Sequence, residues 1–443
     1  MKPQFIIGST TSGGGKTTLL LGLLRVLARK GMKVQPFKCG PDFTDIPYHS
    51  YGAGFESVNL DTWMASKLHV QYIYNKYAEQ ADVCAVEGTM GLFDGFDRMQ
   101  GSSAEIARLL NIPVILVINA RATSYSAAPM LYGFKHFCKS VHIAGVVFNQ
   151  VSSQAHYAAL RTACYDAGLE CFGYLPTMTE ARLPSRHTGL TSTLKQSLDA
   201  IIDRIAACVE QYIDVDKILS LCTRIFPCPY ALPYTSETGI DTFKKRKKKT
   251  LRIAVARDPA FYFVYRETLD RLAACGEVCY FSPVFSNALP EADIVYIPGG
   301  YPELFARQIH RRKKLLAQLH DYAENGGKIL AEGGGMTLLS HSLTAREEGT
   351  AYEMANIFPL DFTMANARQI VGYRRANYRN NELHGYENHF TVLAPTETVL
   401  QPEAPVYTAR GGEVRTPFYR YKNTIAAQVH WYWGEASMLD LWK

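Results

Sequence analysis

Apolar runs and helical patterns alternate along the first 190 residues of the chain. Six short apolar runs have the length and composition of buried strands. They cover residues 4–9, 33–38, 83–88, 113–119, 143–149 and 171–176. Segments between them, such as residues 17–31 and 103–111, show the apolar spacing of amphipathic helices. This alternation predicts an α/β domain with a parallel sheet that helices cover on both faces.

A second alternating series begins near residue 250. Residues 191–222 keep a helical periodicity and extend the first domain, which we place at residues 1–222. Residues 223–249 contain three prolines and a basic run, and they predict an interdomain linker. Residues 250–443 again show strand-like runs, at 251–257, 277–283, 293–300, 327–335 and 425–433. The chain is therefore expected to form two doubly wound α/β domains.

Composition and charge exclude one class of partner. The 443 residues allow two or three domains, and 47% hydrophobic with 20% charged residues is ordinary for a globular protein. The net charge of +6 equals the charge of the basic run at residues 244–249, so the rest of the chain is formally neutral. Because a nucleic-acid-binding surface needs basic residues spread over a face, we expect no nucleic-acid partner.

Cysteine usage and hydropathy indicate the compartment. The ten cysteines are scattered and form no CxxC pair. This spacing is typical of reduced cytosolic thiols, and a zinc site or a disulfide framework is the alternative. The first residues show no signal-peptide pattern, and no apolar run approaches the length of a membrane helix. We therefore expect a cytoplasmic protein without a membrane partner.

The strongest local motif is a glycine-rich loop between the first predicted strand and helix. In QFIIGSTTSGGGKTTLLLGLL, the loop ends with Gly13, Gly14, Gly15, Lys16, Thr17 and Thr18. Glycines of such loops let backbone amides surround phosphates, the lysine reaches the β- and γ-phosphates, and a hydroxyl group binds Mg²⁺. The spacing departs from GxxxxGK, because Thr10 stands at the first glycine position. The alternative is a glycine-rich turn with a solvated lysine.

Acidic side chains follow two of the predicted strands. CGPDFTD contains Asp42 and Asp45, and VEGTMGLFDG contains Glu87 and Asp94. Ligands of open parallel sheets bind outside the carboxyl ends of the strands, where these residues fall. A carboxylate at the end of an apolar strand, such as Glu87, is a usual second anchor for nucleotide-bound Mg²⁺. The alternative for each carboxylate is that it caps a helix or fixes a turn.

Further motifs occur in both halves of the chain. The first half contains GSTTSGGGKTT, VQPFKCGPDFTD, VEGTMGLFDG, GVVFNQV and LPSRHTGL, and the second contains VARDPAFYFVYRETLDRL, IPGGYPELFA, VGYR and VHWYW. Together these motifs resemble the cobyrinate a,c-diamide synthase family. The resemblance implies an ATP-dependent amidoligase of cobalamin biosynthesis. It also implies a dethiobiotin-synthetase-like P-loop NTPase domain followed by a class I glutamine-amidotransferase-like domain of flavodoxin-like fold.

The resemblance implies a mechanism and roles for individual residues. A substrate carboxylate attacks ATP to give an acyl phosphate, and ammonia then displaces phosphate to give the amide. Lys16 would neutralise the β- and γ-phosphates, and Asn149 would contact the adenine edge. A strand-end asparagine that holds a turn is the alternative for Asn149. The expected Mg²⁺ ligands are Thr17, Asp45 and Glu87, and the expected substrate contacts are Asp42 and Asp94.

The second half departs from the family at the glutaminase nucleophile. The family has AECGG, in which the cysteine attacks glutamine from a sharp turn, whereas this chain has AEGGG with Gly333 at that position. His430 matches the general-base histidine, Tyr432 replaces a second histidine, and Gly299 and Gly300 match the oxyanion-hole glycines. We expect that glutamine hydrolysis is lost and that nitrogen comes from free ammonia or from another protein. A buried structural histidine is the alternative for His430, and the sequence leaves open whether Gly333 is natural or engineered.

Other functions of the same fold stay open. Tyr386 stands where relatives commonly have histidine, so a sirohydrochlorin derivative is an alternative substrate. A non-amidating, nucleotide-dependent tetrapyrrole-binding protein and a dethiobiotin-synthetase-like ligase are further alternatives. The expected partners are a tetrapyrrole substrate, ammonia and, from the resemblance alone, a second copy in a homodimer.

Overall fold

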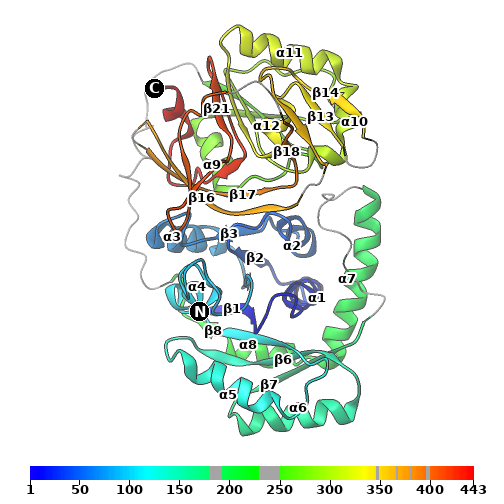
Figure 1. Ribbon diagram of the computed structural model, residues 1–443. Coiled ribbons are helices and arrows are strands. Elements are labelled where there is room, and N and C mark those ends of the chain that lie inside the picture. The colour runs from blue at the N-terminus through cyan, green and yellow to red at the C-terminus, as the bar shows by residue number, and fades with distance from the viewer. Residues whose placement is uncertain are drawn as a thin grey trace. The chain divides into compact units, whose positions relative to one another are not determined.

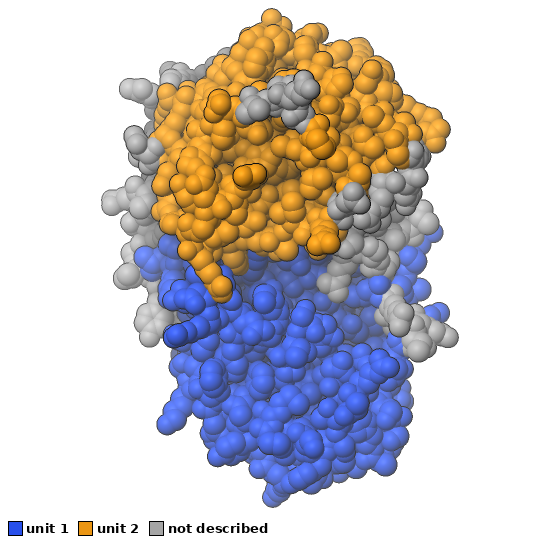
Figure 2. Space-filling view, in the orientation of Figure 1, with its two compact units in different colours: residues 1–186, 190–234 blue, residues 187–189, 235–443 orange. Residues whose placement is uncertain are grey.

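The structure, a computed structural model, contains two compact units (Figure 2). One unit comprises residues 1–186 and 190–234, and the other comprises residues 187–189 and 235–443. The residues that the structure describes are 1–178, 183, 192–228, 250–345, 349–365, 368–379, 381–395 and 400–443. Within these ranges, no helix combines the length and the apolar character that a membrane span requires.

A mainly parallel sheet forms the centre of the first unit (Figure 1). Its strands lie in the order β3-β2-β4-β1-β5-β6-β7, and β8 pairs with β1 in the antiparallel direction. The strands are β1 (Lys2–Ser9), β2 (Val34–Cys39), β3 (Val58–Leu60), β4 (Val83–Glu87), β5 (Val114–Asn119), β6 (Ile143–Val151), β7 (Cys171–Pro176) and β8 (Thr223–Arg224). The six predicted strands are confirmed, whereas β3 is too short for its apolar run to stand out in the sequence.

Helices cover both faces of this sheet. They are α1 (Lys16–Arg29), α2 (Ile46–Ala53), α3 (Lys67–Ala78), α4 (Ser103–Leu110), α5 (Ala127–Phe137), α6 (Gln154–Asp166), α7 (Ser192–Tyr212) and α8 (Val215–Leu221). Right-handed crossovers place α1 and α2 on one face and α3 to α6 on the other. Apolar residues of α1, α7 and α8 share one core with the sheet. Gly22 lets α1 and α7 approach closely, because a Cβ atom there would lie 2.6 Å from a Val209 methyl group.

Residues 223–228, which the sequence predicts as the start of a linker, pack onto the first unit instead. Thr223 and Arg224 form β8 against the first residues of β1. Cys228 is buried, and its backbone N–H group donates a 2.9 Å hydrogen bond to the side-chain oxygen of Asn75. Pairing with the first residues of β1 thus continues a contact that begins at Cys222, whose carbonyl oxygen accepts a 3.0 Å hydrogen bond from the N–H group of Gln4. The rest of the predicted linker, including the basic run, lies outside the described residues.

The second unit contains another parallel sheet. Its order is β10-β9-β11-β12-β22-β21, and β21 alone runs antiparallel to its neighbour. The strands are β9 (Leu251–Ala256), β10 (Gly276–Phe281), β11 (Ile294–Ile297), β12 (Lys328–Glu332), β21 (Phe418–Tyr421) and β22 (Thr424–Ala427). The helices are α9 (Arg266–Cys275), α10 (Ala306–His310), α11 (Lys313–Glu324) and α12 (Gly334–Leu338). Two 3₁₀ helices are η4 (Pro302–Leu304) and η5 (Met438–Trp442). Successive β9 residues enter two different apolar cores, Ile253 one and Ala254 the other, so both sheet faces are buried.

Two further sheets of the second unit are not predicted, and the predicted strand-like run 425–433 is divided between β22 and a strand of one of these sheets. One is a mixed sheet in the order β14-β13-β15-β18, in which β13 and β15 run parallel, and the other is an antiparallel sheet in the order β20-β19-β16-β17-β23. Their strands are β13 (Ser342–Thr344), β14 (Ala351–Glu353), β15 (Asp361–Thr363), β16 (Ile370–Tyr378), β17 (Asn381–His389), β18 (Val392–Leu393), β19 (Val406–Thr408), β20 (Glu413–Val414) and β23 (Val429–Trp431). The long pair β16 and β17 is not predicted, because arginine, asparagine and glutamate interrupt its apolar pattern.

Candidate active site

The loop between β1 and α1 is shaped by its glycines. Gly13 and Gly15 have φ angles of +73° and +106°, which favour glycine. Gly14 is required for space, because a Cβ atom would lie 2.0 Å from Ser9 Oγ. No side chain caps the amino terminus of α1. The first backbone N–H groups of this helix are therefore directed toward the place that a phosphate group occupies in such loops.

The side chain of Lys16, the first residue of α1, reaches the loop that follows β4. Its Nζ atom donates a 2.5 Å hydrogen bond to the carbonyl oxygen of Met90. Burial and the neighbouring charge of Lys38 lower the pKa of Lys16 below its ordinary value. Thr18 lies half-buried on the first turn of α1. The lysine is thus already placed among the charged groups of the site, beside the uncapped helix end.

Glu87, the last residue of β4, lies at the centre of a buried charge cluster. Its Oε1 atom accepts hydrogen bonds from Thr17 Oγ1 at 2.7 Å and from Lys38 Nζ at 3.1 Å. Its Oε2 atom lies 2.5 Å from His49 Nε2. Lys38 also forms an ion pair with Asp45 at 2.7 Å. Burial alone would raise the pKa of Glu87, but the charges of Lys38 and His49 lower it below the ordinary value.

Lys38 and His49 are residues of this cluster that the sequence analysis does not select. Lys38 stands directly opposite Glu87 in the register of β2 and β4. Burial opposes its charge, yet Asp45 and Glu87 raise the pKa of Lys38 above the ordinary value. A lysine inside a predicted buried strand is a usable signal, because charged residues are almost never fully buried without a partner. His49 gives no such signal, since its contact with Glu87 depends on the packing of α2.

The donor set of this cluster suits Mg²⁺. Thr17, Asp45 and Glu87 offer a hydroxyl group and two carboxylates, which are the hard oxygen ligands that this ion prefers. Over the part of the chain that the structure describes, no group of three or more His, Cys, Asp or Glu side chains forms a metal site. Mg²⁺ in nucleotide sites is typically held by one or two carboxylates together with substrate phosphates. The three ligands stay predictions.

Asp42, Asp94 and Asn149 make local contacts in the structure. Asp42 Oδ1 accepts hydrogen bonds from the backbone N–H and hydroxyl groups of Thr44, both at 2.8 Å. Asp94 Oδ2 accepts one from the N–H group of Gly91 at 3.0 Å. Asn149 Nδ2 donates to the carbonyl oxygen of Gly14 at 3.0 Å. The contacts of Asp42 and Asp94 match the turn-fixing alternative, whereas Asn149 joins β6 to the glycine loop. The predicted substrate and adenine contacts stay predictions.

In the second unit, Gly333 follows β12 and begins the turn into α12. Its φ angle of +50° with ψ of −120° is a conformation that side chains disfavour. A Cβ atom at Gly333 would lie 2.2 Å from Cε1 and 2.7 Å from Nε2 of His430. A Cβ atom at Gly299 would lie 2.2 Å from the same Nε2 atom. The histidine ring therefore fills the space that a side chain at position 333 needs, and Gly300 has a φ angle of +150° beside it.

His430 lies on β23 and is 1% exposed. Burial, and next the charge of His389, lower the pKa of His430 to about 3, so the ring is neutral at physiological pH. Tyr432 is also buried and packs its ring 5.4 Å from that of Tyr265. Glu332, directly before Gly333, accepts hydrogen bonds from Tyr296 and Trp433, and burial raises its pKa to about 8. The surroundings of Gly333 are thus packed, and they offer no nucleophile among these residues.

Comparisons with known proteins match both units. A sequence model of the CobQ/CobB/MinD/ParA nucleotide binding domain matches residues 5–190, and one of the CobB/CobQ-like glutamine amidotransferase domain matches residues 252–438. Cobyrinate a,c-diamide synthase from Streptococcus sanguinis is 36% identical and covers 99% of this chain and 99% of the relative. The enzyme of the same name from Caldanaerobacter subterraneus subsp. tengcongensis is 35% identical, covering 96% of this chain and 94% of the relative.

A third relative comes from an archaeon. The cobyrinate a,c-diamide synthase of Archaeoglobus fulgidus is 34% identical and covers 97% of this chain and 94% of the relative. The similarity thus runs through both units at nearly full length in each case. The chain therefore belongs to the cobyrinate a,c-diamide synthase family and is a ligase-type enzyme with a nucleotide-binding domain.

Proposed function

We propose that the chain amidates side-chain carboxylates of a tetrapyrrole, with cobyrinate as the substrate, at the expense of ATP and in cobalamin biosynthesis. The observation that carries this proposal is the cluster of Thr17, Lys38, Asp45 and Glu87 beside Lys16. Such a set of fixed charges next to a phosphate-binding loop is what phosphoryl transfer needs, because positioning and neutralisation dominate that chemistry.

The proposed reaction has two steps. An oxygen atom of the substrate carboxylate attacks the γ-phosphorus of ATP, and ADP leaves, which gives an acyl phosphate. Ammonia then adds to the acyl carbon, inorganic phosphate leaves, and a proton is released. Mg²⁺, held by Thr17, Asp45 and Glu87 when bound, would neutralise phosphate charge. Lys16 would stabilise the negative charge that shifts onto the β–γ bridging oxygen.

Lys38 has a separate role in this proposal. It contacts both Asp45 and Glu87, so it holds the two buried carboxylates at fixed positions, and its charge lowers the pKa of Glu87. Ionised carboxylates are the forms that bind a cation, and a protonated one would donate a hydrogen bond instead. Lys38 is therefore a positioning residue, while Lys16 would touch the nucleotide.

We further propose that free ammonia, or ammonia from another protein, is the nitrogen source. Position 333 lacks a nucleophile, and the neutral His430 ring occupies the adjacent space. Covalent glutamine hydrolysis needs a nucleophilic thiolate, and glycine at position 333 has no thiol.

The test is incubation of the full chain with ATP, Mg²⁺ and cobyrinate, with ammonium or glutamine as the nitrogen donor. We expect phosphate release with ammonium, and a product mass in which carboxyl groups have become amides. Glutamine should support almost no turnover. Absence of an amide product with cobyrinate and with sirohydrochlorin would refute the amidation, and efficient turnover with glutamine would refute the nitrogen source.

A further inference from the structure

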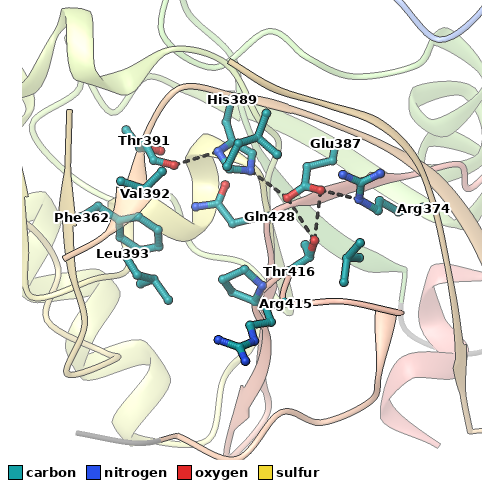
Figure 3. Close-up of a pocket in the computed structure, with 13 residues that line it drawn as sticks. Phe362, Arg374, Glu387, His389, Thr391, Val392, Leu393, Arg415, Thr416 and Gln428 are labelled. Atoms are coloured by element: carbon teal, nitrogen blue, oxygen red, sulfur yellow. Dashed lines mark hydrogen bonds and ion pairs between the residues drawn. The ribbon is translucent and has the colours of Figure 1, made fainter. Parts of the chain in front are cut away.

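A cavity of about 320 Å³ lies within the second unit (Figure 3). Its charged and polar lining residues are Arg374, Glu387, His389, Thr391, Thr416, Gln428 and the exposed Arg415. The apolar lining consists of Phe362, Ile370, Val392, Leu393, Val414 and Pro417. A volume of this size, lined by both apolar and polar side chains, falls in the range of small-molecule sites.

The cavity is separate from the glutaminase position. In the antiparallel pair of β17 and β23, Tyr386 stands opposite His430, and Glu387 stands opposite Val429. Residues opposite each other share a face of the sheet, and neighbours along a strand point to opposite faces. Glu387 and His389, which line the cavity, therefore lie on the face of β17 that is turned away from His430.

Three groups hold the carboxylate of Glu387 in place. Arg374 Nε donates to Oε2 at 2.5 Å, and His389 Nε2 lies 2.9 Å from Oε1. The hydroxyl group of Thr416 lies 3.0 and 3.2 Å from the two oxygens. Arg415 adds a second guanidinium group to the lining, so two arginines stand against one carboxylate. The cavity therefore favours an anion.

Gln428 carries the strongest indication of a ligand. Its side chain is 1% exposed, and neither the amide nitrogen nor the amide oxygen has a hydrogen-bond partner among the described residues. Figure 3 shows this amide between the side of the cavity formed by Val392 and Leu393 and the side formed by Glu387 and Thr416. A buried amide without partners is costly, so a bound group that both donates and accepts a hydrogen bond would stabilise it.

We propose that this cavity binds a short-chain organic carboxylate whose far end carries an amide or a hydroxyl group. The carboxylate end meets the positive charge of Arg374 and Arg415. The aliphatic part lies against the apolar wall that includes Phe362 and Leu393, and the far end exchanges two hydrogen bonds with Gln428. This binding goes beyond the amidation proposed for the first unit and requires no nucleotide.

The test uses calorimetry of the full chain with three molecules of nearly equal shape. Glutaramate has both a carboxylate and an amide end, glutaramide has no charge, and 5-methylhexanoate has an apolar end in place of the amide. We expect glutaramate to bind at least about tenfold more tightly than either of the others, since each lacks one of the two recognised groups. Absence of heat with millimolar glutaramate, or equal affinity for all three molecules, would overturn the proposal.

Two variants test the position of the ligand. Gln428→Leu removes both amide contacts with little change of volume, and Arg415→Gln removes the exposed charge. Each should weaken glutaramate binding about tenfold or more, while Arg311→Gln, an exposed arginine outside the cavity, should leave it unchanged. Arg415→Gln changes an exposed side chain, so it keeps the test valid if Gln428→Leu fails to fold. Unchanged binding in Arg415→Gln, or crystallographic density for glutaramate beside Gly333 instead of Gln428, would contradict the assignment.

Discussion

Replacing Lys38 by methionine tests the electrostatic logic of the first unit. Lys38, Asp45 and Glu87 are each less than 5% exposed, and the lysine lies 2.7 and 3.1 Å from the two carboxylates. At an effective dielectric constant of about 20, one such pair at this separation contributes about 5 kcal/mol of attraction before desolvation is counted. Removing one partner from a buried pair typically costs about 3–5 kcal/mol, and we expect a loss in this range.

The pH dependence of the loss gives a sharper result. In the wild type, Lys38 and His49 hold the pKa of Glu87 below its ordinary value of 4.5, so its contribution to stability is present above that pH and is lost as the pH falls. Without Lys38, burial of the carboxylate is opposed less strongly, so the pKa of Glu87 moves upward. Where the pKa of Glu87 in the folded variant exceeds 4.5, the contribution of Glu87 to stability decreases as the pH rises. We therefore expect the slope of stability against pH to fall, or to reverse, between pH 5 and pH 7.

Hydrogen–deuterium exchange of peptides from β2 and β4 measures this loss as a reduced free energy of opening. Lys30→Met is the matched control, because Lys30 pairs with Asp216 at 2.6 Å on the surface, where such pairs contribute about 0–1 kcal/mol. The double variant Lys38→Met/Glu87→Gln should regain part of the loss, since it buries one fewer uncompensated charge. A loss of less than about 1 kcal/mol in Lys38→Met, with no recovery in the double variant, would refute the reasoning.

Four further predictions follow from the two units. Lys16→Ala should abolish ATP turnover while thermal unfolding changes little, because the side chain acts on phosphate and does not belong to the apolar core; retained turnover would remove the lysine from the mechanism. Gly333→Cys should destabilise the second unit by about 1–3 kcal/mol through overpacking against His430, and it should give no glutamine hydrolysis; calorimetry and a glutamate-release assay decide. Glu332 has a folded pKa of about 8, above its ordinary 4.5, so its contribution to stability is full below pH 4.5 and is lost toward pH 8; Glu332→Gln should flatten this dependence in urea denaturation, and an unchanged slope would contradict the assignment. Deletion of residues 244–249 should leave turnover with ammonium unchanged, and loss of activity would show that the basic run takes part.

The sequence predicts the strands and the phosphate loop of the first unit well because their signals are local. A buried parallel strand is a continuous apolar run, and the glycine loop with Lys16 is a contiguous motif. The sequence predicts only part of the cluster around Glu87. Lys38 and His49 are missed because they lie on β2 and α2 and contact Glu87 only through strand order and helix packing. Strand order is a property of the whole sheet, and no short segment encodes it.

The second unit shows the same limit more strongly. The register of β16 and β17, which forms the cavity around Glu387, depends on pairing between strands whose polar residues hide the two-residue alternation. The unpartnered amide of Gln428 is likewise visible only when the surrounding strands are in place. By contrast, the missing nucleophile at Gly333 needs only a motif, so the sequence indicates it directly.

The packing around Gly333 distinguishes two possibilities for the second unit. Either only the nucleophilic side chain was lost, or the residues around position 333 also repacked after that loss. If only the side chain had been lost, a void would remain at the turn between β12 and α12, and the ring of His430 would keep its position. Here the ring of His430 lies 2.2 Å from the position of a Cβ atom at residue 333, and it lies equally close to the position of a Cβ atom at Gly299. The ring is also neutral and 1% exposed, which suits a packing role. Restoring a thiol therefore requires moving the histidine as well, and we infer that the second unit now serves through its structure while the first unit carries the chemistry.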